Sequence, residues 1–294
     1  MNPPSGAAFR DGYFTVRDGL RLHYRDYPGP PGSTPLLCLP GLTRNVRDFA
    51  ELAERLSPRY RVLVLEFRGR GESEFDPQPH RYMPLTYAHD VIALLDHVGI
   101  ADAVFVGTSL GGLVTMTLAV IEEERIAAAI LNDVGPELED VGIDRIRGYV
   151  GGGKSFASWT EAGKSVGITH QNLPVSHTAA DWERIARRLC KVDDDGTIRF
   201  DYDMAIADPF NREGPTEQVD MWPFFNALGQ HPLLVVRGER SDLLSAAGLE
   251  KMRAAAPEMR HVTVAGVGHA PELIEPEAIA AIESFLAALD LDAA

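Results

Sequence analysis

The sequence has few cysteines and no run of apolar residues long enough to cross a membrane. Only 2 of its 294 residues are cysteines, with Cys38 inside a short apolar run and Cys190 far along the chain, so a structural disulfide is not expected. A membrane-spanning helix needs about 20 apolar residues in succession. The first residues also lack the basic and apolar parts of a secretion signal. We therefore expect a cytoplasmic protein.

Basic residues are also scarce. The chain carries 28 Lys and Arg against 43 Asp and Glu, which gives a formal net charge of −15 at pH 7. Nucleic acids and anionic membranes are bound through clustered Lys and Arg, so neither is expected as a partner. The 9 histidines form no H-E-x-x-H or H-x-x-E-H pattern, and the cysteines form no C-x-x-C pair, so no metal site is expected. We expect a small-molecule acyl substrate and no cofactor, and the sequence leaves a homo-oligomer open.

The chain does contain a regular alternation of strand and helix patterns. Two strand-like runs, 13–16 and 20–24, are joined through Asp18 and Gly19, which predicts an antiparallel hairpin. Continuous apolar runs follow, separated by helical patterns, and such runs are typical of strands buried on both faces of a parallel sheet. They are 36–39, 62–65, 104–106, 128–131, 233–236 and 262–264. The sequence therefore predicts an α/β fold with a mostly parallel, doubly wound sheet.

The alternation is interrupted once. Between residues 131 and 233 no stretch has a convincing strand pattern, but the segment carries periodic apolar residues and all three tryptophans of the chain. A structureless loop of that length inside a compact domain is rare. We therefore predict a helical cap at 136–225, inserted into a core domain formed by 1–135 and 226–294.

The motif G-T-S-L-G at 107–111 carries the strongest chemical signal. It follows an apolar run at 103–106 and precedes a helical pattern, as in a nucleophile elbow, where a serine stands at the tip of a sharp turn between strand and helix. Such a turn needs neighbours without side chains, and Gly107 and Gly111 supply them. The motif predicts Ser109 as a nucleophile.

A serine nucleophile needs a histidine base that is oriented by a carboxylate. His269 lies in a glycine-bounded loop after the last strand pattern, and Asp242 follows the run 233–236. In this order, serine, acid and histidine match the arrangement of α/β-hydrolases. Asp133, after the run 128–131, is an alternative acid. We expect Asp242 to orient His269 and keep Asp133 as the alternative.

The reaction also needs donors aimed at the negative oxygen of the tetrahedral intermediate. The backbone amide of Leu110 directly follows the nucleophile, at the positive end of the predicted helix. The amide of Leu42 follows the first parallel strand, where Gly41 allows a close turn. We expect these two amides to form an oxyanion hole.

Further segments accompany the motif, namely L-P-G at 39–41, F-R-G-R-G-E-S at 67–73 and G-H at 268–269. Together with 107–112 and Asp242 they resemble the capped esterase, lactonase and epoxide-hydrolase branch of the α/β-hydrolase superfamily, which usually has D-x-R-G-x-G-x-S near 67–73. Pro40 stands where the family usually has histidine, and Glu66 stands near its usual aspartate. The resemblance covers nearly the whole chain and implies an α/β-hydrolase fold and a Ser-His-Asp hydrolase, but no particular substrate. Because epoxide hydrolases and dehalogenases of this branch use an aspartate nucleophile, the serine at 109 argues against both.

We therefore expect a carboxylesterase-like serine hydrolase that cleaves a carboxylic ester or a related acyl compound. Hydrolysis of a lactone or of a carbon–carbon bond on the same triad is an alternative. Carbon–carbon hydrolases of this kind act on anionic substrates and need a cationic anchor, for which Arg44, Arg187 and Arg188 are candidates. An alternative of another class is a ligand-binding sensor on a hydrolase scaffold.

Overall fold

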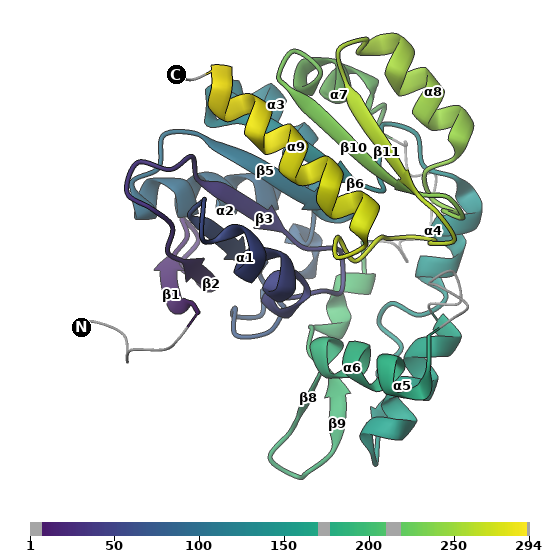
Figure 1. Cartoon of the computed structure of the whole chain (residues 1–294). Helices are drawn as coiled ribbons and strands as arrows, with labels where there is room; N and C mark the ends of the chain where they lie inside the picture. Colours follow the sequence, from purple (N-terminus) through teal and green to yellow (C-terminus); the bar gives the residue numbers. More distant parts are fainter. Residues whose placement is uncertain (1–7, 170–176, 210–218, 293–294) are drawn as a thin grey trace.

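A computed structural model of the chain describes residues 8–169, 177–209 and 219–292. Its centre is an eight-stranded sheet with strand order β1-β2-β4-β3-β5-β6-β10-β11 (Figure 1). The strands are β1 (Arg10–Thr15), β2 (Arg21–Tyr27), β3 (Leu36–Leu39), β4 (Val62–Leu65), β5 (Ala103–Thr108), β6 (Ile126–Asn132), β10 (Leu233–Gly238) and β11 (Arg260–Val264). β2 pairs antiparallel with both β1 and β4, and every other pairing in this sheet is parallel. The predicted hairpin and the mostly parallel sheet are confirmed.

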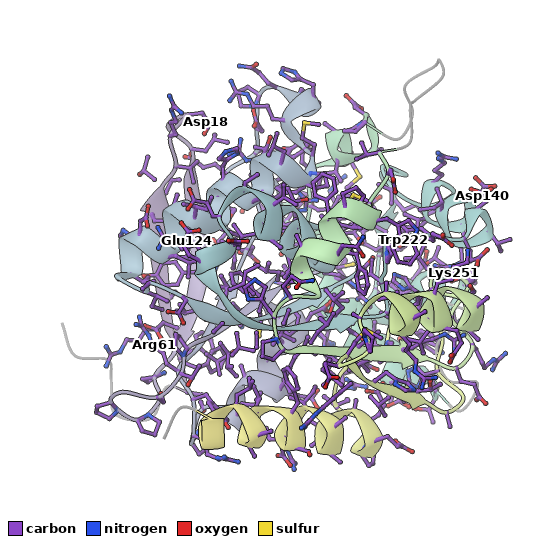
Figure 2. All side chains as sticks on the ribbon, turned by 90° about the horizontal axis from the view of Figure 1, so that it is seen from above. Asp18, Arg61, Glu124, Asp140, Trp222 and Lys251 are labelled. Atoms are coloured by element: carbon purple, nitrogen blue, oxygen red, sulfur yellow. The ribbon has the colours of Figure 1, made fainter. Side chains whose placement is uncertain are left out.

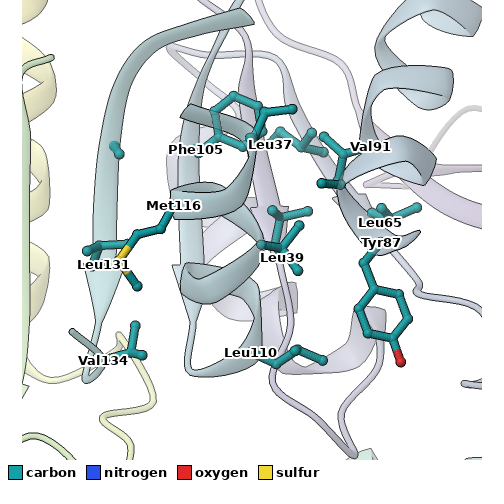
Figure 3. Close-up of a cluster of buried hydrophobic side chains, with 14 of the residues drawn as sticks. Leu37, Leu39, Leu65, Tyr87, Val91, Phe105, Leu110, Met116, Leu131 and Val134 are labelled. Atoms are coloured by element: carbon teal, nitrogen blue, oxygen red, sulfur yellow. The ribbon is translucent and has the colours of Figure 1, made fainter. Parts of the chain in front are cut away.

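Helices cover both faces of the sheet because its strands are apolar on both sides. Leu37 and Leu39 of β3 belong to a core cluster with α2 and α3, whereas Leu36 and Cys38 of the same strand belong to a second cluster with α1 and α9. Figure 3 shows part of the first cluster, in which Met116 of α3 and Val91 of α2 lie against the sheet. Figure 2, seen from above, places α9 on one side of the sheet and α7 on the other. These helices are α1 (Ala50–Leu56), α2 (Pro84–Val98), α3 (Leu110–Ile121), α7 (Trp222–Leu228), α8 (Ala246–Ala255) and α9 (Pro276–Asp292).

Between β6 and β10 the chain builds a separate lobe, seen at the bottom of Figure 1. It has its own apolar core, which includes Phe156, Val166, Ile185 and Leu189. The lobe is tied to the core domain through the short 3-10 helix Val46–Phe49, since Arg47 forms an ion pair of 2.7 Å with Asp201. Its elements are β7 (Ser155–Phe156), α5 (Trp159–Thr169), α6 (Ala179–Leu189), β8 (Cys190–Val192) and β9 (Ile198–Phe200). Helix α4 (Asp140–Arg147) belongs to the same insertion but lies beside the core domain, and its Ile146 packs into the core cluster of the large sheet.

The insertion contains the expected helices, but it also contains strands where the sequence shows no convincing strand pattern. Strands β7, β9 and β8 form a small antiparallel sheet in that order. Each strand has only 2 or 3 residues, which is too short for alternation of side chains to be recognised in the sequence. The turn between β8 and β9 passes through Gly196 at a φ of 79°. The expected boundary at residue 225 falls inside α7, whose Phe225 and Leu228 pack into the core cluster of the sheet.

Two further properties bear on function. None of the helices in the described parts of the chain is long and apolar enough to cross a membrane. Within the same residues, no group of three or more His, Cys, Asp or Glu is arranged to hold a metal ion.

Candidate active site

Ser109 lies at the tip of a sharp turn between β5 and α3. Its backbone has a φ of 52° and a ψ of −113°, a strained conformation for a residue with a side chain. The turn also requires glycine on both sides. A Cβ atom on Gly107 would lie 2.6 Å from the carbonyl carbon of Gly111, and one on Gly111 would lie 2.0 Å from the carbonyl oxygen of Leu39. The motif therefore has the geometry of a nucleophile elbow.

The histidine predicted from the sequence lies beside this serine. Nε2 of His269 is 3.0 Å from Oγ of Ser109, and Nδ1 of the same ring is 2.8 Å from Oδ2 of Asp133. The His269 side chain is 9% exposed and Asp133 is fully buried, so the imidazole bridges the interior and the surface. A hydroxyl, an imidazole and a carboxylate joined in this order can produce an activated nucleophile.

The carboxylate on His269 is the alternative acid, Asp133. This residue directly follows β6 and has a φ of 58°, which turns its side chain toward the ends of β10 and β11. Its Oδ1 accepts a hydrogen bond of 2.8 Å from the amide of Gly238, and its Oδ2 accepts one of 2.6 Å from the hydroxyl of Ser241. These donors fix the carboxylate in the orientation that His269 requires.

The structure corrects the expectation that Asp242 orients His269. Asp242 instead forms two hydrogen bonds, of 2.6 and 2.9 Å, with Arg145 of α4. Burial acts to raise the pKa of Asp242, but the hydrogen bonds and charge of Arg145 outweigh it, and the pKa is lowered. Asp242 lies four residues beyond the end of β10, in a turn that faces α4, whereas Asp133 follows its strand immediately.

Asn132 supports the site although the sequence analysis did not single it out. Its backbone carbonyl accepts a hydrogen bond of 3.0 Å from the amide of Ser109. Its side-chain amide donates to the carbonyl of Pro271 at 2.9 Å and to the hydroxyl of Thr108 at 3.0 Å. Asn132 therefore joins the elbow to the loop that carries His269, and only its position next to Asp133 hints at this in the sequence.

The two amides expected to form the oxyanion hole flank Ser109. Leu110 is the first residue of α3, so its N–H group has no acceptor within the helix. Leu42 lies in the loop after β3, which lines the same cleft as Ser109 and His269. Both residues thus belong to segments next to Ser109, and the role of their amides as oxyanion donors stays a prediction.

A buried arginine that the sequence analysis did not select holds the loop of Leu42. Arg70 is fully buried, and its Nε and Nη2 atoms donate to the carbonyl oxygen of Leu42 at 2.9 and 2.8 Å. Its Nη1 donates to the hydroxyl of Tyr87 at 2.9 Å. The carbonyl of Leu42 shares one planar peptide unit with the amide of Thr43, so this clamp fixes the backbone of the loop directly after Leu42. Arg70 lies in the segment 67–73 that carries the family resemblance.

Glu66, at the position near the family's usual aspartate, secures the same region. Its carboxylate accepts hydrogen bonds from the amide of Val46 at 3.2 Å and from the amide of Glu72 at 2.8 Å. It is 1% exposed. A glutamate at this position therefore still ties the loop after β3 to the segment 67–73.

The cleft over Ser109 is lined by both domains and contains several cations. Arg44 and Gly41 come from the loop after β3, Arg145 from α4, and Arg188 from α6. The structure thus brings two of the predicted cationic anchors, Arg44 and Arg188, to the serine. The third, Arg187, stacks over the ring of Trp159 at 4.4 Å in the lobe.

Comparison with known proteins agrees with this geometry. Residues 34–276 match the family model described as the alpha/beta hydrolase fold. The chain is similar to a 3-hydroxybutyrate-oligomer hydrolase from Cupriavidus necator, with 32% identity over 90% of this chain and 92% of that protein. It is also similar to a 2-(acetamidomethylene)succinate hydrolase from Mesorhizobium japonicum, with 29% identity over 87% of this chain and 89% of the other. The crystal structure of an alpha/beta hydrolase from Novosphingobium aromaticivorans superposes with a TM-score of 0.90 at 50% identity and covers 96% of this chain and 99% of that one.

Proposed function

The chain belongs to the α/β-hydrolase fold family, and we propose that it is a serine hydrolase that cleaves a carboxylic ester through an acyl-enzyme. The observation that carries the proposal is the continuous hydrogen-bonded chain from Ser109 Oγ through His269 to Asp133 Oδ2. A ligand-binding protein has no need of a serine held in a strained turn against an oriented imidazole.

Each residue has one role in the proposed reaction. His269 takes the proton of the Ser109 hydroxyl as the oxygen attacks the substrate carbonyl, and it later gives this proton to the leaving group. Asp133 keeps Nδ1 protonated, so that Nε2 is the acceptor, and stabilises the imidazolium that forms. A water molecule activated by His269 then releases the acyl group. No step calls for a metal or an organic cofactor.

The amides of Leu42 and Leu110 are proposed to bind the negative oxygen of the tetrahedral intermediates. Loss of one such donor typically costs about 2.7–4 kcal/mol of transition-state stabilisation. The Leu110 amide acts together with the positive end of α3, and the Leu42 amide with the Arg70 clamp behind it.

The inserted segment 136–225 is proposed to act as the cap of the site. Residues of α4 and α6 line the cleft over Ser109 together with the core domain. Substrate bound to the serine would therefore contact both parts of the chain. A cytoplasmic location remains the expectation from the sequence.

The relatives support hydrolysis and favour an ester. A 3-hydroxybutyrate oligomer, the compound in the name of the Cupriavidus protein, is a chain of hydroxy acids joined by ester bonds. Lactone and carbon–carbon bond hydrolysis would use the same triad, and each needs its own substrate test. The sensor alternative requires slow or absent turnover.

The first test is steady-state hydrolysis of p-nitrophenyl esters of increasing acyl length, with the Ser109→Ala protein as the blank. We expect turnover with a maximum at one chain length and none above background in the variant. A single burst of p-nitrophenol without turnover would favour the sensor. Mass spectrometry of the quenched enzyme checks the covalent step, because an acyl group should be found on the wild-type protein and not on Ser109→Ala.

A further inference from the structure

Three arginines line the cleft over Ser109, and they differ in how their charges are used. Arg145 is held by Asp242 through two hydrogen bonds of 2.6 and 2.9 Å. Arg188 donates from Nη1 to Glu272 at 2.7 Å and from Nη2 to Glu51. Both guanidinium groups therefore face carboxylates of the protein itself and brace the walls of the cleft.

Arg44 is different. Its Nε lies 3.3 Å from Oδ2 of Asp48, but within the described residues Nη1 and Nη2 have no hydrogen-bond partner. Its side chain is 19% exposed, which is enough for the outer edge of the guanidinium to remain accessible from the cleft. Two parallel N–H groups on that edge have the spacing of the two oxygens of a carboxylate.

Arg44 is also close to the nucleophile. A Cβ atom placed on Gly41 would lie 3.3 Å from Cγ of Arg44 and 3.8 Å from Cβ of Ser109. The stem of Arg44 and the serine thus both lie close to the same glycine, in the loop proposed to hold the oxyanion. Arg44 and Ser109 also line the same cleft.

The acidic groups around Arg44 leave its charge available. Glu272 is engaged by Arg188, and Asp242 by Arg145. Burial acts to raise the pKa of Asp48, the charges of Arg44 and Arg188 act to lower it, and the net shift is upward. The described residues that line the cleft include three arginines and two carboxylates, Asp48 and Glu272, in a protein whose net charge is −15.

We propose that Arg44 binds a carboxylate of the substrate, so that the site prefers an acyl group that carries a negative charge a few atoms from the scissile carbonyl. This inference rests on the proposed ester hydrolysis and names its substrate class. Arg44 acts as a specificity-determining residue, and Arg145 and Arg188 hold the walls between which the anion binds.

The test compares two esters with the same acyl length, p-nitrophenyl hemiglutarate, which ends in a carboxylate, and p-nitrophenyl pentanoate, which is neutral. Wild-type protein should have the higher kcat/KM for the hemiglutarate. Arg44→Gln should lower kcat/KM for this ester roughly 10- to 100-fold, mainly through KM, because a charge-assisted pair is lost. Hydrolysis of the pentanoate should change less than about twofold. Arg44→Lys should restore part of the preference, since it keeps the charge but not the planar fork.

Two controls accompany these variants. Arg253→Gln removes an arginine that pairs with Glu250 on the exposed side of α8, and it should leave both esters unaffected. Ser109→Ala supplies the spontaneous rate for each ester. Equal losses on the two esters in Arg44→Gln would mean that Arg44 only supports its loop, and no loss on either would mean that it does not contact the acyl group. Either result overturns the inference and leaves the proposed ester hydrolysis standing.

A binding measurement separates the inference from turnover. Calorimetric titration of glutarate into the Ser109→Ala protein should show binding that becomes at least about tenfold weaker when Arg44→Gln is added to the same protein. Absence of glutarate binding, or equal affinity in the two proteins, overturns the anion site. The proposed reaction alone would be overturned by a different result. In that case the wild-type protein would hydrolyse no ester faster than Ser109→Ala does, while glutarate binding would still depend on Arg44.

Discussion

Within the parts of the chain that the structure describes, two clusters that each contain a histidine, a carboxylate and a serine can be compared, and one of the two has the arrangement needed for catalysis. In the cleft, His269 lies between Asp133 and the hydroxyl of Ser109. On the hairpin side of the sheet, His23 of β2 has Nδ1 at 2.8 Å from Glu66 and Nε2 at 2.9 Å from Asp11.

The serine of the second cluster is used differently as well. The hydroxyl of Ser73 donates to the backbone carbonyl of Glu66 at 2.6 Å and accepts from the amide of His23 at 2.9 Å. Both ring nitrogens of His23 face carboxylates, so neither is available to accept a proton from a hydroxyl. Burial acts to lower the pKa of His23, but its bonds to Glu66 and Asp11 outweigh this and the pKa is raised. The comparison teaches that the group facing the second imidazole nitrogen decides whether a histidine can act as a base.

The largest difference in kcat should be found between alanine variants of the two serines. Ser109→Ala should lower kcat by a factor on the order of a million, because the nucleophile of a triad cannot be replaced by the remaining groups. Ser73→Ala should leave kcat within about threefold of the wild-type value. It should cost roughly 1–3 kcal/mol of stability, since it leaves a buried amide and carbonyl unsatisfied. Ester hydrolysis and urea unfolding measure the two effects, and a large fall in kcat in Ser73→Ala would contradict the comparison.

The next largest effect should distinguish the two aspartates. Asp133→Asn should lower kcat by about 10⁴-fold, because an amide no longer fixes the tautomer of His269. Asp242→Asn, which weakens the contact with Arg145, should lower kcat less than about tenfold. The measurement is kcat for each variant on the best p-nitrophenyl ester. Comparable losses in the two variants would show that Asp242 shares the role assigned to Asp133.

The sequence predicts the sheet and most of the site because the signals involved are local. Apolar runs identify strands that are buried on both faces, and the glycines around Ser109 identify a turn that no other residue fits. His269 is found because its loop is bounded by glycines and follows the last strand. Each of these depends only on residues that are adjacent in the chain.

The choice of acid could not be made in this way. Asp133 and Asp242 both follow parallel strands, so both lie at the same edge of the sheet. Only the φ of Asp133 and the donors Gly238 and Ser241, which are more than 100 residues away in the sequence, decide which carboxylate reaches the imidazole. The role of Arg70 was equally hidden, because its acceptor on Leu42 is 28 residues away. The small sheet of the inserted lobe could not be predicted, because its strands are too short to show the alternation of apolar and polar side chains.

A smaller difference in kcat is expected between lysine variants of two buried arginines near these clusters. Arg70→Lys should lower kcat roughly tenfold with little change in KM, because a single ammonium cannot hold the Leu42 carbonyl as the guanidinium fork does. Arg68→Lys is the matched control. Arg68 pairs with Asp18, Asp76 and Asp90 on the hairpin side, and its replacement should reduce stability while kcat changes less than about twofold. Loss of kcat in Arg68→Lys alone would contradict the positioning role of Arg70.

The smallest effect on turnover should come from His23→Gln, which should instead change how the unfolding free energy depends on pH. The pKa of His23 is raised above its usual 6.5 in the folded protein, so the folded state holds this proton more tightly than the unfolded state does. Its stabilisation is therefore fully present below pH 6.5 and is lost as the pH rises through the raised pKa. The difference in unfolding free energy between wild type and His23→Gln should be largest near pH 6 and shrink as the pH rises through the raised pKa. Urea unfolding across this range measures the difference. The pH dependence of kcat should stay the same in the variant, because the proton transferred in the reaction is held by His269; a shifted kcat profile would show that the two histidines are coupled.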